Sequence, residues 1–376
     1  MGNRRILTWI FLLFIAGACK KDKGPEVLVN SDPTDGITLY SPLTGGTTDY
    51  GSVLLLDKYG NTIAQQPTSA DAYNFEKWTA NGKVRYTYLQ RDLNTKQTDP
   101  SMIPCNAFIL DENFVKLKKI SLLPYNGRTD ALAVDGHEFI YIDDNHYITL
   151  SYFEKGVTNI PASLNPVANC KVVTPIIQEV MNDKVVWEWQ GADYPEFYAN
   201  SIESNKFSDA TVFHDYMHMN SMFLDPTDNN LICSNRNQNN VIKINRTSGA
   251  IMWRLGGNNS NFTLTSNMKF LRQHHATLTD NNQTLLIFDN GQITERKWSR
   301  IVEFKLNTNE NTVQSFSSFN LPDSTFCQFM GSVQKRGDTY FIGCGSTPKL
   351  MEVNYKTGKI NLLMSFPKYS YRALKY

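Results

Sequence analysis

A repeated strand–turn–strand unit limits the folds that this sequence can form. Each unit is an apolar run of alternating pattern, a turn rich in Asp, Asn and Gly, and a second such run. Period-two alternation predicts β-strands, and the polar turn predicts a hairpin. Units too small to bury their own faces must pack against one another in an array. Six copies recur at intervals of some tens of residues: "VLLLDKYGNTIAQ", "AFILDENFVKLKKI", "PIIQEVMNDKVVWEW", "NVIKINRTSGAIMWRL", "RIVEFKLNTNENTVQSF" and "KLMEVNYKTGKINLLM".

A second type of hairpin lies between these copies. Two hairpins per repeat make one four-stranded antiparallel sheet, and six such sheets around a channel make a β-propeller. The sequence therefore predicts an all-β, six-bladed propeller over residues 37–376, closed by the extended C-terminal stretch "KYSYRALKY" against early strands. Two β-sandwich domains are the alternative, but the strict alternation of hairpin types favours the propeller. The second hairpin reads "HEFIYIDDNHYITLSY", "HMNSMFLDPTDNNLICSNR", "HHATLTDNNQTLLIFDNG" and "MGSVQKRGDTYFIGCGS".

The first residues carry a targeting signal. Two arginines precede the apolar run "ILTWIFLLFIAG", which is too short to span a bilayer and ends in small residues before a cysteine. This pattern predicts a lipoprotein signal peptide at residues 1–18, with Cys19 lipidated; an ordinary secretory signal is the alternative. Residues 19–36 are predicted to be a tether. We expect a protein of the bacterial cell envelope, lipid-anchored, in the periplasm or on the cell surface.

Composition excludes several classes of function. The net charge of +1 and the lack of basic runs argue against nucleic-acid binding, and the anchor is the only expected contact with a membrane. Five cysteines remain after Cys19, without CxxC spacing, so we expect mainly buried thiols, with one or two disulfides as the alternative. We expect no cofactor and no metal. His214 and His218, four positions apart, leave a metal site as the weaker alternative.

Three histidines occupy equivalent positions in the second hairpin. His137, His218 and His274 each begin one copy. The innermost strand of each blade lines the channel, so we expect these three imidazoles to converge from three blades. Singly, each would more often be a structural residue. Together they predict a functional site.

An amide and an arginine accompany this histidine set. Asn220 follows His218 by two positions and is expected on the same face of the strand. Arg236 ends the returning strand, and its planar guanidinium suits an oxyanion such as phosphate, sulfate or carboxylate. The five residues together predict a site that handles an anion.

Part of the chain resembles the bacterial arylsulfate sulfotransferases. The resemblance is carried by "HDYMHMNSMFLDPTDNNLICSNRNQNNVIKINRTSGAIMWRLGG", then "RQHHATLTDNNQTLLIFDNG" and "SRIVEFKL", and is strongest over residues 210–306. Its specific element is H-x-N followed by N-R at the family's spacing. The family consists of periplasmic six-bladed propellers that move a sulfuryl group between phenols without a nucleotide donor. The family's separate β-rich N-terminal domain is expected to be reduced or missing here.

The resemblance implies roles for the site residues. His274 matches the nucleophile that forms a sulfohistidine. His218, Asn220 and Arg236 match residues that hold the sulfuryl oxygens, and His137 matches a further active-site histidine. His275 is the rival nucleophile; because strand neighbours point to opposite faces, we expect only one of the pair to face the channel, and favour His274.

The implied reaction fits these residue types. Sulfuryl transfer resembles phosphoryl transfer, so catalysis is mainly positioning and electrostatics. A covalent intermediate shared by two half-reactions predicts ping-pong kinetics. The expected partners are a small-molecule aryl sulfate donor and a phenolic acceptor, and a homodimer is left open. The alternatives are a propeller that binds sulfated or phenolic ligands without turnover, and an envelope scaffold with a degenerate site.

Overall fold

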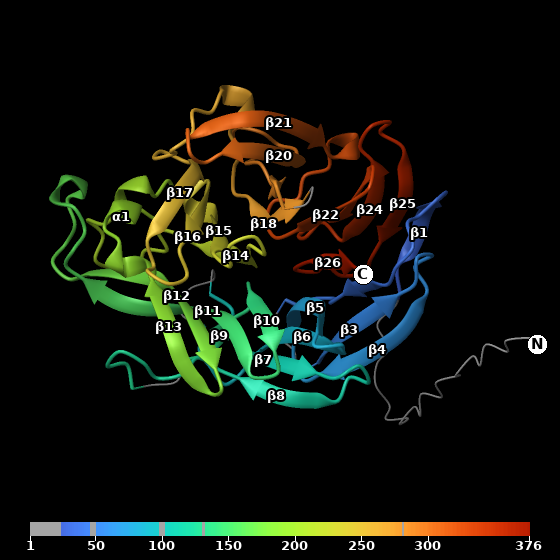
Figure 1. Ribbon diagram of the computed structural model, residues 1–376, viewed down its shortest axis with the longest axis horizontal. Coiled ribbons are helices and arrows are strands. Elements are labelled where there is room, and N and C mark those ends of the chain that lie inside the picture. Colours follow the sequence, from blue (N-terminus) through green and yellow to red (C-terminus); the bar gives the residue numbers. More distant parts are fainter. Residues whose placement is uncertain (1–23, 46–49, 98–101, 130–131, 280–281) are drawn as a thin grey trace, which may run out of the picture.

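The computed structural model describes residues 24–45, 50–97, 102–129, 132–279 and 282–376. The chain forms six antiparallel sheets arranged radially around a channel (Figure 1). The prediction of an all-β, six-bladed propeller of four-stranded blades is confirmed. The predicted signal peptide (1–18) and lipidated Cys19 lie outside the described residues.

The first three blades take up the first half of the chain. Strands are given from the channel outwards. Blade 1 is β26 (Ala373–Lys375), β2 (Thr38–Tyr40), β3 (Gly51–Leu56) and β4 (Thr62–Thr68). Blade 2 is β5 (Ala72–Ala80), β6 (Lys83–Arg91), β7 (Pro104–Leu110) and β8 (Lys116–Ile120), with β9 (Val134–Asp135) also paired to β7. Blade 3 is β10 (Phe139–Asp143), β11 (His146–Val157), β12 (Cys170–Met181) and β13 (Lys184–Gln190).

The last three blades carry most of the predicted site. Blade 4 is β14 (Met219–Leu224), β15 (Leu231–Asn235), β16 (Asn240–Ile244) and β17 (Ile251–Gly256). Blade 5 is β18 (His274–Thr279), β19 (Thr284–Asp289), β20 (Arg300–Asn307) and β21 (Thr312–Asn320). Blade 6 is β22 (Ser332–Arg336), β23 (Thr339–Gly343), β24 (Lys349–Asn354), β25 (Ile360–Ser365) and β1 (Glu26–Asn30).

The two repeated units correspond to the two halves of a blade. The first unit forms the outer two strands of all six blades, and the second forms the inner two strands of blades 3 to 6. The polar turns allow this because Asn and Asp tolerate positive φ. Asn182 and Asp183 have φ of 51° and 59° and join β12 to β13 through a two-residue turn of the type that matches strand twist.

Strands from both ends of the chain close the ring. β26 pairs with β2 in blade 1, which confirms that the C-terminal stretch pairs with an early strand. β1 pairs with β25 at the outer edge of blade 6. The expected tether over residues 19–36 is therefore wrong for its second part. Val27 and Val29 are β-branched and favour an extended strand, and β1 adds a fifth strand to an otherwise unpaired sheet edge.

The hydrophobic core lies between neighbouring blades. One buried cluster joins Ile232 and Val241 of blade 4 to Ile287 and Val302 of blade 5. Complete burial of each such side chain contributes roughly 1.5–3 kcal/mol, so each blade depends on its neighbours for stability. The five cysteines of the described residues are all buried free thiols, as mainly expected: Cys105, Cys170, Cys233, Cys327 and Cys344.

Helical structure is confined to the connections. The one α-helix of the described ranges, α1 (Glu196–Asn200), lies in the loop from blade 3 to blade 4. Within those ranges no helix is long and apolar enough to cross a membrane. Short 3-10 turns occur at Ala162–Leu164, Gly191–Asp193, Arg236–Gln238, Ser266–Met268 and Pro322–Ser324.

Candidate active site

Three of the predicted histidines meet where the innermost strands begin. His137 lies two residues before β10, His218 immediately precedes β14, and His274 is the first residue of β18. The ring centroids of His137 and His218 are 5.0 Å apart, with the ring planes at 83°. The charges of both rings act on His274 and lower its pKa. The three imidazoles, from three blades, therefore share one environment, which we call the histidine cluster.

Two of these histidines are oriented by aspartates. His218 Nδ1 lies 2.7 Å from Asp215 Oδ2, and the main-chain N–H of His218 donates to Asp215 Oδ1 at 3.0 Å. His137 makes the same pair of contacts with Oδ1 of Asp135. A carboxylate at Nδ1 fixes the proton on that nitrogen and leaves Nε2 for chemistry. Sequence reasoning missed both aspartates, although each lies only two or three positions before its histidine.

His274 is oriented by an amide instead. The Nδ2 group of Asn290 donates to the main-chain oxygens of Cys327, at 2.7 Å, and Met330, at 2.8 Å. Its Oδ1 must then be the atom that faces His274 Nδ1, at 2.8 Å. An amide oxygen only accepts, so Nδ1 carries the proton and Nε2 carries the lone pair. Asn290, which belongs to the "FDNG" stretch of the resemblance, thus contacts His274 directly, and it was not among the predicted site residues.

The environment of His274 keeps its ring neutral. Burial is the largest cause that lowers its pKa well below the usual value, and the positive charge of Arg236 adds to the shift. The hydrogen bond with Asn290 acts in the opposite direction. The pKa of His218 is also lowered, first by burial, and its pairing with Asp215 partly offsets that shift. A neutral imidazole with a free Nε2 lone pair is the form that acts as a nucleophile.

Arg236 supplies positive charge to the histidine cluster. It follows β15, and its charge lowers the pKa of both His218 and His274. Its Nη1 donates to Glu203 at 3.2 Å and to Asn237 at 2.6 Å. Nε and Nη2 have no partner among the described residues, so one edge of the guanidinium remains able to bind an oxyanion.

Asn220 is anchored to the residue that precedes His274. Its Nδ2 donates to the main-chain oxygen of Gln273 at 2.8 Å, and its side chain is fully buried. It therefore fixes the residue before His274 relative to β14. His218 has a left-handed φ of 49° and precedes the regular strand. The expectation that Asn220 lies on the same face as the His218 side chain stays a prediction. Its assigned role in holding a sulfuryl oxygen stays a prediction.

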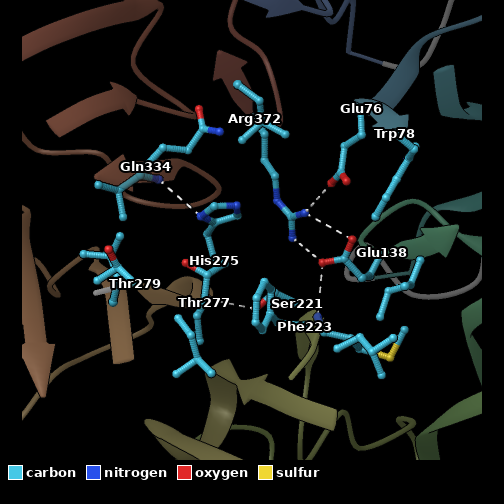
Figure 2. A pocket seen from close by; sticks show the side chains of 18 of the residues that line it. Glu76, Trp78, Glu138, Ser221, Phe223, His275, Thr277, Thr279, Gln334 and Arg372 are labelled. Atoms are coloured by element: carbon cyan, nitrogen blue, oxygen red, sulfur yellow. Dashed lines mark hydrogen bonds and ion pairs between the residues drawn. The ribbon is translucent and has the colours of Figure 1, made fainter. Parts of the chain in front are cut away.

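His274 and His275 point in different directions, as expected, but it is His275, and not His274, that lines the channel cavity. His275 lines a cavity of about 520 Å³ inside the channel (Figure 2), whereas His274 contacts Asn290 and the histidine cluster. The reason is local. His275 has φ of 49°, and the pairing of β18 with β19 shifts register between His274 and Thr277. β18 therefore starts with a bulge instead of a regular strand.

Two tyrosines complete the surroundings of the histidine cluster. The ring centroid of Tyr371 lies 5.5 Å from that of His137, and its hydroxyl donates to the main-chain oxygen of Asn220 at 2.7 Å. Tyr152 lies 6.2 Å from His137 and donates to the main-chain oxygen of Met219 at 2.6 Å. Tyr152 ends the hairpin that begins with His137 and Tyr371 lies in the C-terminal stretch, but neither was predicted to be a site residue.

Other candidate residues lie apart from this cluster. His214 Nε2 contacts the main-chain oxygen of Asp209 at 3.0 Å, so the alternative metal pair with His218 does not form. The described residues contain no group of three or more His, Cys, Asp or Glu side chains that could hold a metal ion. His146 is half-buried, and its Nε2 lies 2.6 Å from Oε1 of Glu179.

Known proteins provide an independent comparison. No curated protein matches the chain. Solved propellers match its overall shape at about 10% identity, and they show no more than the fold. A protein of unknown function from Bacteroides caccae has a TM-score of 0.46, over 91% of this chain and 99% of that one. The periplasmic gluconolactonase PpgL of Pseudomonas aeruginosa has a TM-score of 0.45 at 10% identity, over 91% and 99%.

The family comparison is specific. The model of the arylsulfotransferase (ASST) family matches residues 80–376, which is most of the chain and includes every residue of the histidine cluster. The resemblance drawn from the histidine hairpins is thus confirmed, and the chain belongs to the arylsulfotransferase (ASST) family.

Proposed function

We propose that this protein is a nucleotide-independent aryl sulfotransferase in which His274 carries the sulfuryl group between two phenols. Family membership supports sulfotransferase activity in general. The observation that carries the finer proposal is the hydrogen bond of Asn290 to His274 Nδ1, because it leaves the Nε2 lone pair of a neutral ring available.

In the first half-reaction, His274 Nε2 attacks the sulfur of the aryl sulfate. The N–S bond forms, the S–O bond to the aryl group breaks, and a phenolate leaves. The main-chain N–H of Met330 approaches Nε2 at 3.2 Å in the resting protein and must give up this weak contact. That N–H then lies beside the new bond and can donate to a sulfuryl oxygen. The free edge of Arg236 stabilises the charge on the peripheral oxygens.

A neighbouring imidazolium supplies the proton that the phenolate needs. His218 and His137 each hold one proton on Nδ1 against an aspartate, so their Nε2 atoms can carry the proton that is transferred. Burial disfavours the charged ring of His218, and the negative charge of a bound sulfate ester favours it. The same Nε2 takes the proton of the acceptor phenol in the second half-reaction. The phenol oxygen then attacks sulfur, the N–S bond breaks and neutral His274 is restored.

The test measures release of nitrophenolate from 4-nitrophenyl sulfate by the purified protein, with and without phenol and without nucleotide. We expect release that depends on phenol, ping-pong kinetics, and one SO₃ group on His274 by mass spectrometry when phenol is omitted. His274→Ala abolishes transfer. If His275→Ala abolishes it while His274→Ala retains it, the nucleophile is assigned wrongly. Saturable binding of the ester with no turnover would support the binding propeller instead.

We also propose that the protein is attached to the cell envelope through lipid on Cys19. The proposal rests on the apolar run and the small residues before that cysteine. Metabolic labelling with a fatty acid, lost in Cys19→Ser, tests it.

A further inference from the structure

The channel holds a cavity that is separate from the histidine cluster. Its volume is about 520 Å³, within the usual range of small-molecule sites, and the innermost strands of all six blades contribute to its walls. Neither the three clustered histidines nor Arg236 line it. Polar and apolar side chains both line it, and the aromatic residues on its walls include Trp78, Tyr141 and Phe223.

Neighbouring residues at the starts of the innermost strands face either the histidine cluster or the channel cavity. His137, His274 and Tyr371 belong to the histidine cluster or its surroundings, whereas the residues that follow each of them line the channel cavity. These following residues are Glu138, His275 and Arg372. The cavity therefore lies directly behind the histidine cluster, with its own set of polar groups.

The carboxylate of the cavity is already fully used. Oε2 of Glu138 accepts from Arg372 Nη2 at 2.8 Å and from the main-chain N–H of Met222 at 3.1 Å. Its Oε1 accepts from Asn74 Nδ2 at 2.7 Å and from Arg372 Nη1 at 3.2 Å. Glu138 thus neutralises Arg372 and has no lone pair left to attract a cationic ligand.

Two donors at the same end of the cavity lack partners. His275 Nδ1 accepts from the main-chain N–H of Val333 at 3.3 Å, so in the neutral ring Nε2 carries the proton. Burial and the charge of Arg372 both lower the pKa of His275 well below its usual value, which keeps the ring neutral. Among the described residues nothing accepts from that Nε2–H or from the Nε–H of Arg372, which is buried. Figure 2 shows the two side chains next to each other.

The surrounding groups favour an acceptor over a cation. Burial and the charge of Glu138 raise the pKa of Glu76 to about 8, and Arg372 Nη1 donates to Glu76 Oε1 at 3.3 Å, so this second carboxyl of the cavity is also already paired. The Ser221 hydroxyl oxygen accepts from the main-chain N–H of Ala276 at 3.2 Å, which leaves its O–H to donate. His275 also has a left-handed φ of 49°, and such strain in a bulky residue is concentrated at functional sites.

We propose that the channel cavity binds a small aromatic molecule bearing an oxyanion, such as an aryl carboxylate. One oxygen accepts from His275 Nε2–H, beside the positive charge of Arg372, and the ring packs between Phe223 and Trp78. This site is distinct from the histidine cluster and does not depend on sulfuryl transfer.

The test is calorimetric titration of the purified protein with 4-hydroxybenzoate, its neutral methyl ester and tyramine. We expect saturable 1:1 binding of 4-hydroxybenzoate, and at least tenfold weaker binding of the ester and the amine. His275→Leu removes the donor at similar size and weakens binding at least tenfold. His275→Gln restores an N–H and keeps affinity within about threefold. Phe223→Leu, a milder change in the aromatic part of the wall, also weakens binding.

His274→Ala is the matched control, because the neighbouring histidine does not line this cavity. We expect His274→Ala to bind 4-hydroxybenzoate as the wild type does, even if sulfuryl transfer is lost. The binding assay therefore tests the cavity, and the transfer assay tests the nucleophile. The proposal is overturned if 4-hydroxybenzoate shows no saturable binding, if tyramine binds more tightly, or if folded His275→Leu binds as the wild type does. Loss of binding in His274→Ala alone would place the ligand in the histidine cluster.

Discussion

Replacing Asn290 by alanine tests the orientation of the nucleophile. The side chain is fully buried and makes three hydrogen bonds, to His274 Nδ1 and to the main-chain oxygens of Cys327 and Met330. Each contributes about 1 kcal/mol net, and two buried carbonyls lose a donor, so we expect a loss of about 3–5 kcal/mol in the free energy of unfolding. The remaining partner of Nδ1 is the main-chain oxygen of Arg272, at 3.1 Å. His274 thus keeps a weaker constraint on its tautomer, and kcat/KM should fall about 10- to 100-fold.

Gln178→Ala provides the control for stability. Gln178 is also fully buried and makes three hydrogen bonds, two with the main chain of Leu123 and one with Glu188. It lies in blade 3 and contacts no residue of the histidine cluster. Both variants should lose similar amounts of stability in urea titrations, whereas kcat/KM of the folded fraction falls only in Asn290→Ala. Equal activity in the two variants would refute the orienting role of Asn290.

The pH profile adds a second measurement. In the wild type the pKa of His274 lies well below its usual value, so the reactive neutral form persists as pH falls and is lost only through that low pKa. In Asn290→Asp a carboxylate replaces the amide at Nδ1 and stabilises the imidazolium, which should raise this pKa. The acidic limb of kcat/KM then moves to higher pH. An unmoved limb would mean that His274 does not set it.

Three further predictions concern other parts of the molecule. Asp215→Asn removes the carboxylate that favours the charged form of His218. We expect kcat/KM to fall more with phenyl sulfate, which has a poor leaving group, than with 4-nitrophenyl sulfate. Equal losses with the two substrates would mean that His218 is not the proton donor. Arg236→Lys keeps the positive charge but loses the planar guanidinium, and kcat should fall at least tenfold. Full activity would mean that only the charge of Arg236 contributes to catalysis. Deletion of residues 24–30 removes β1 and should lower Tm by a few degrees in calorimetry, with kcat/KM unchanged, because β1 lies at the outer edge of blade 6.

The fold was accessible from the sequence because hairpins are local. The turn residues and the alternating runs are contiguous, so each blade could be drawn before its neighbours were known. The histidine cluster was accessible for the same reason: once hairpins are aligned, His137, His218 and His274 occupy one position. Blade 1 has no contiguous inner hairpin to align, because its innermost strand comes from the far end of the chain. Tyr371 and Arg372, which lie just before that strand, were therefore not predicted.

Details that depend on contacts between blades were not accessible. Asn290 orients His274 through two carbonyls of the loop leading into blade 6, and no motif spans that distance. The directions of His274 and His275 depend on a bulge that strand alternation does not predict. The pairing of β1 with β25 depends on an open sheet edge that only the completed ring presents.

The ring is closed by two pairings of distant strands, β26 with β2 and β1 with β25, and both must form late in folding. This closure joins Ser41 to Ser370, 329 positions apart, and such distant contacts form slowly. Until β26 reaches β2, blade 1 lacks its inner strand, and until β1 reaches β25, blade 6 keeps an exposed edge. Each is a template for a strand of another molecule. Two chains folding side by side could therefore exchange β26 or β1, and a high local concentration of unfolded chains would favour interlocked dimers over closed monomers.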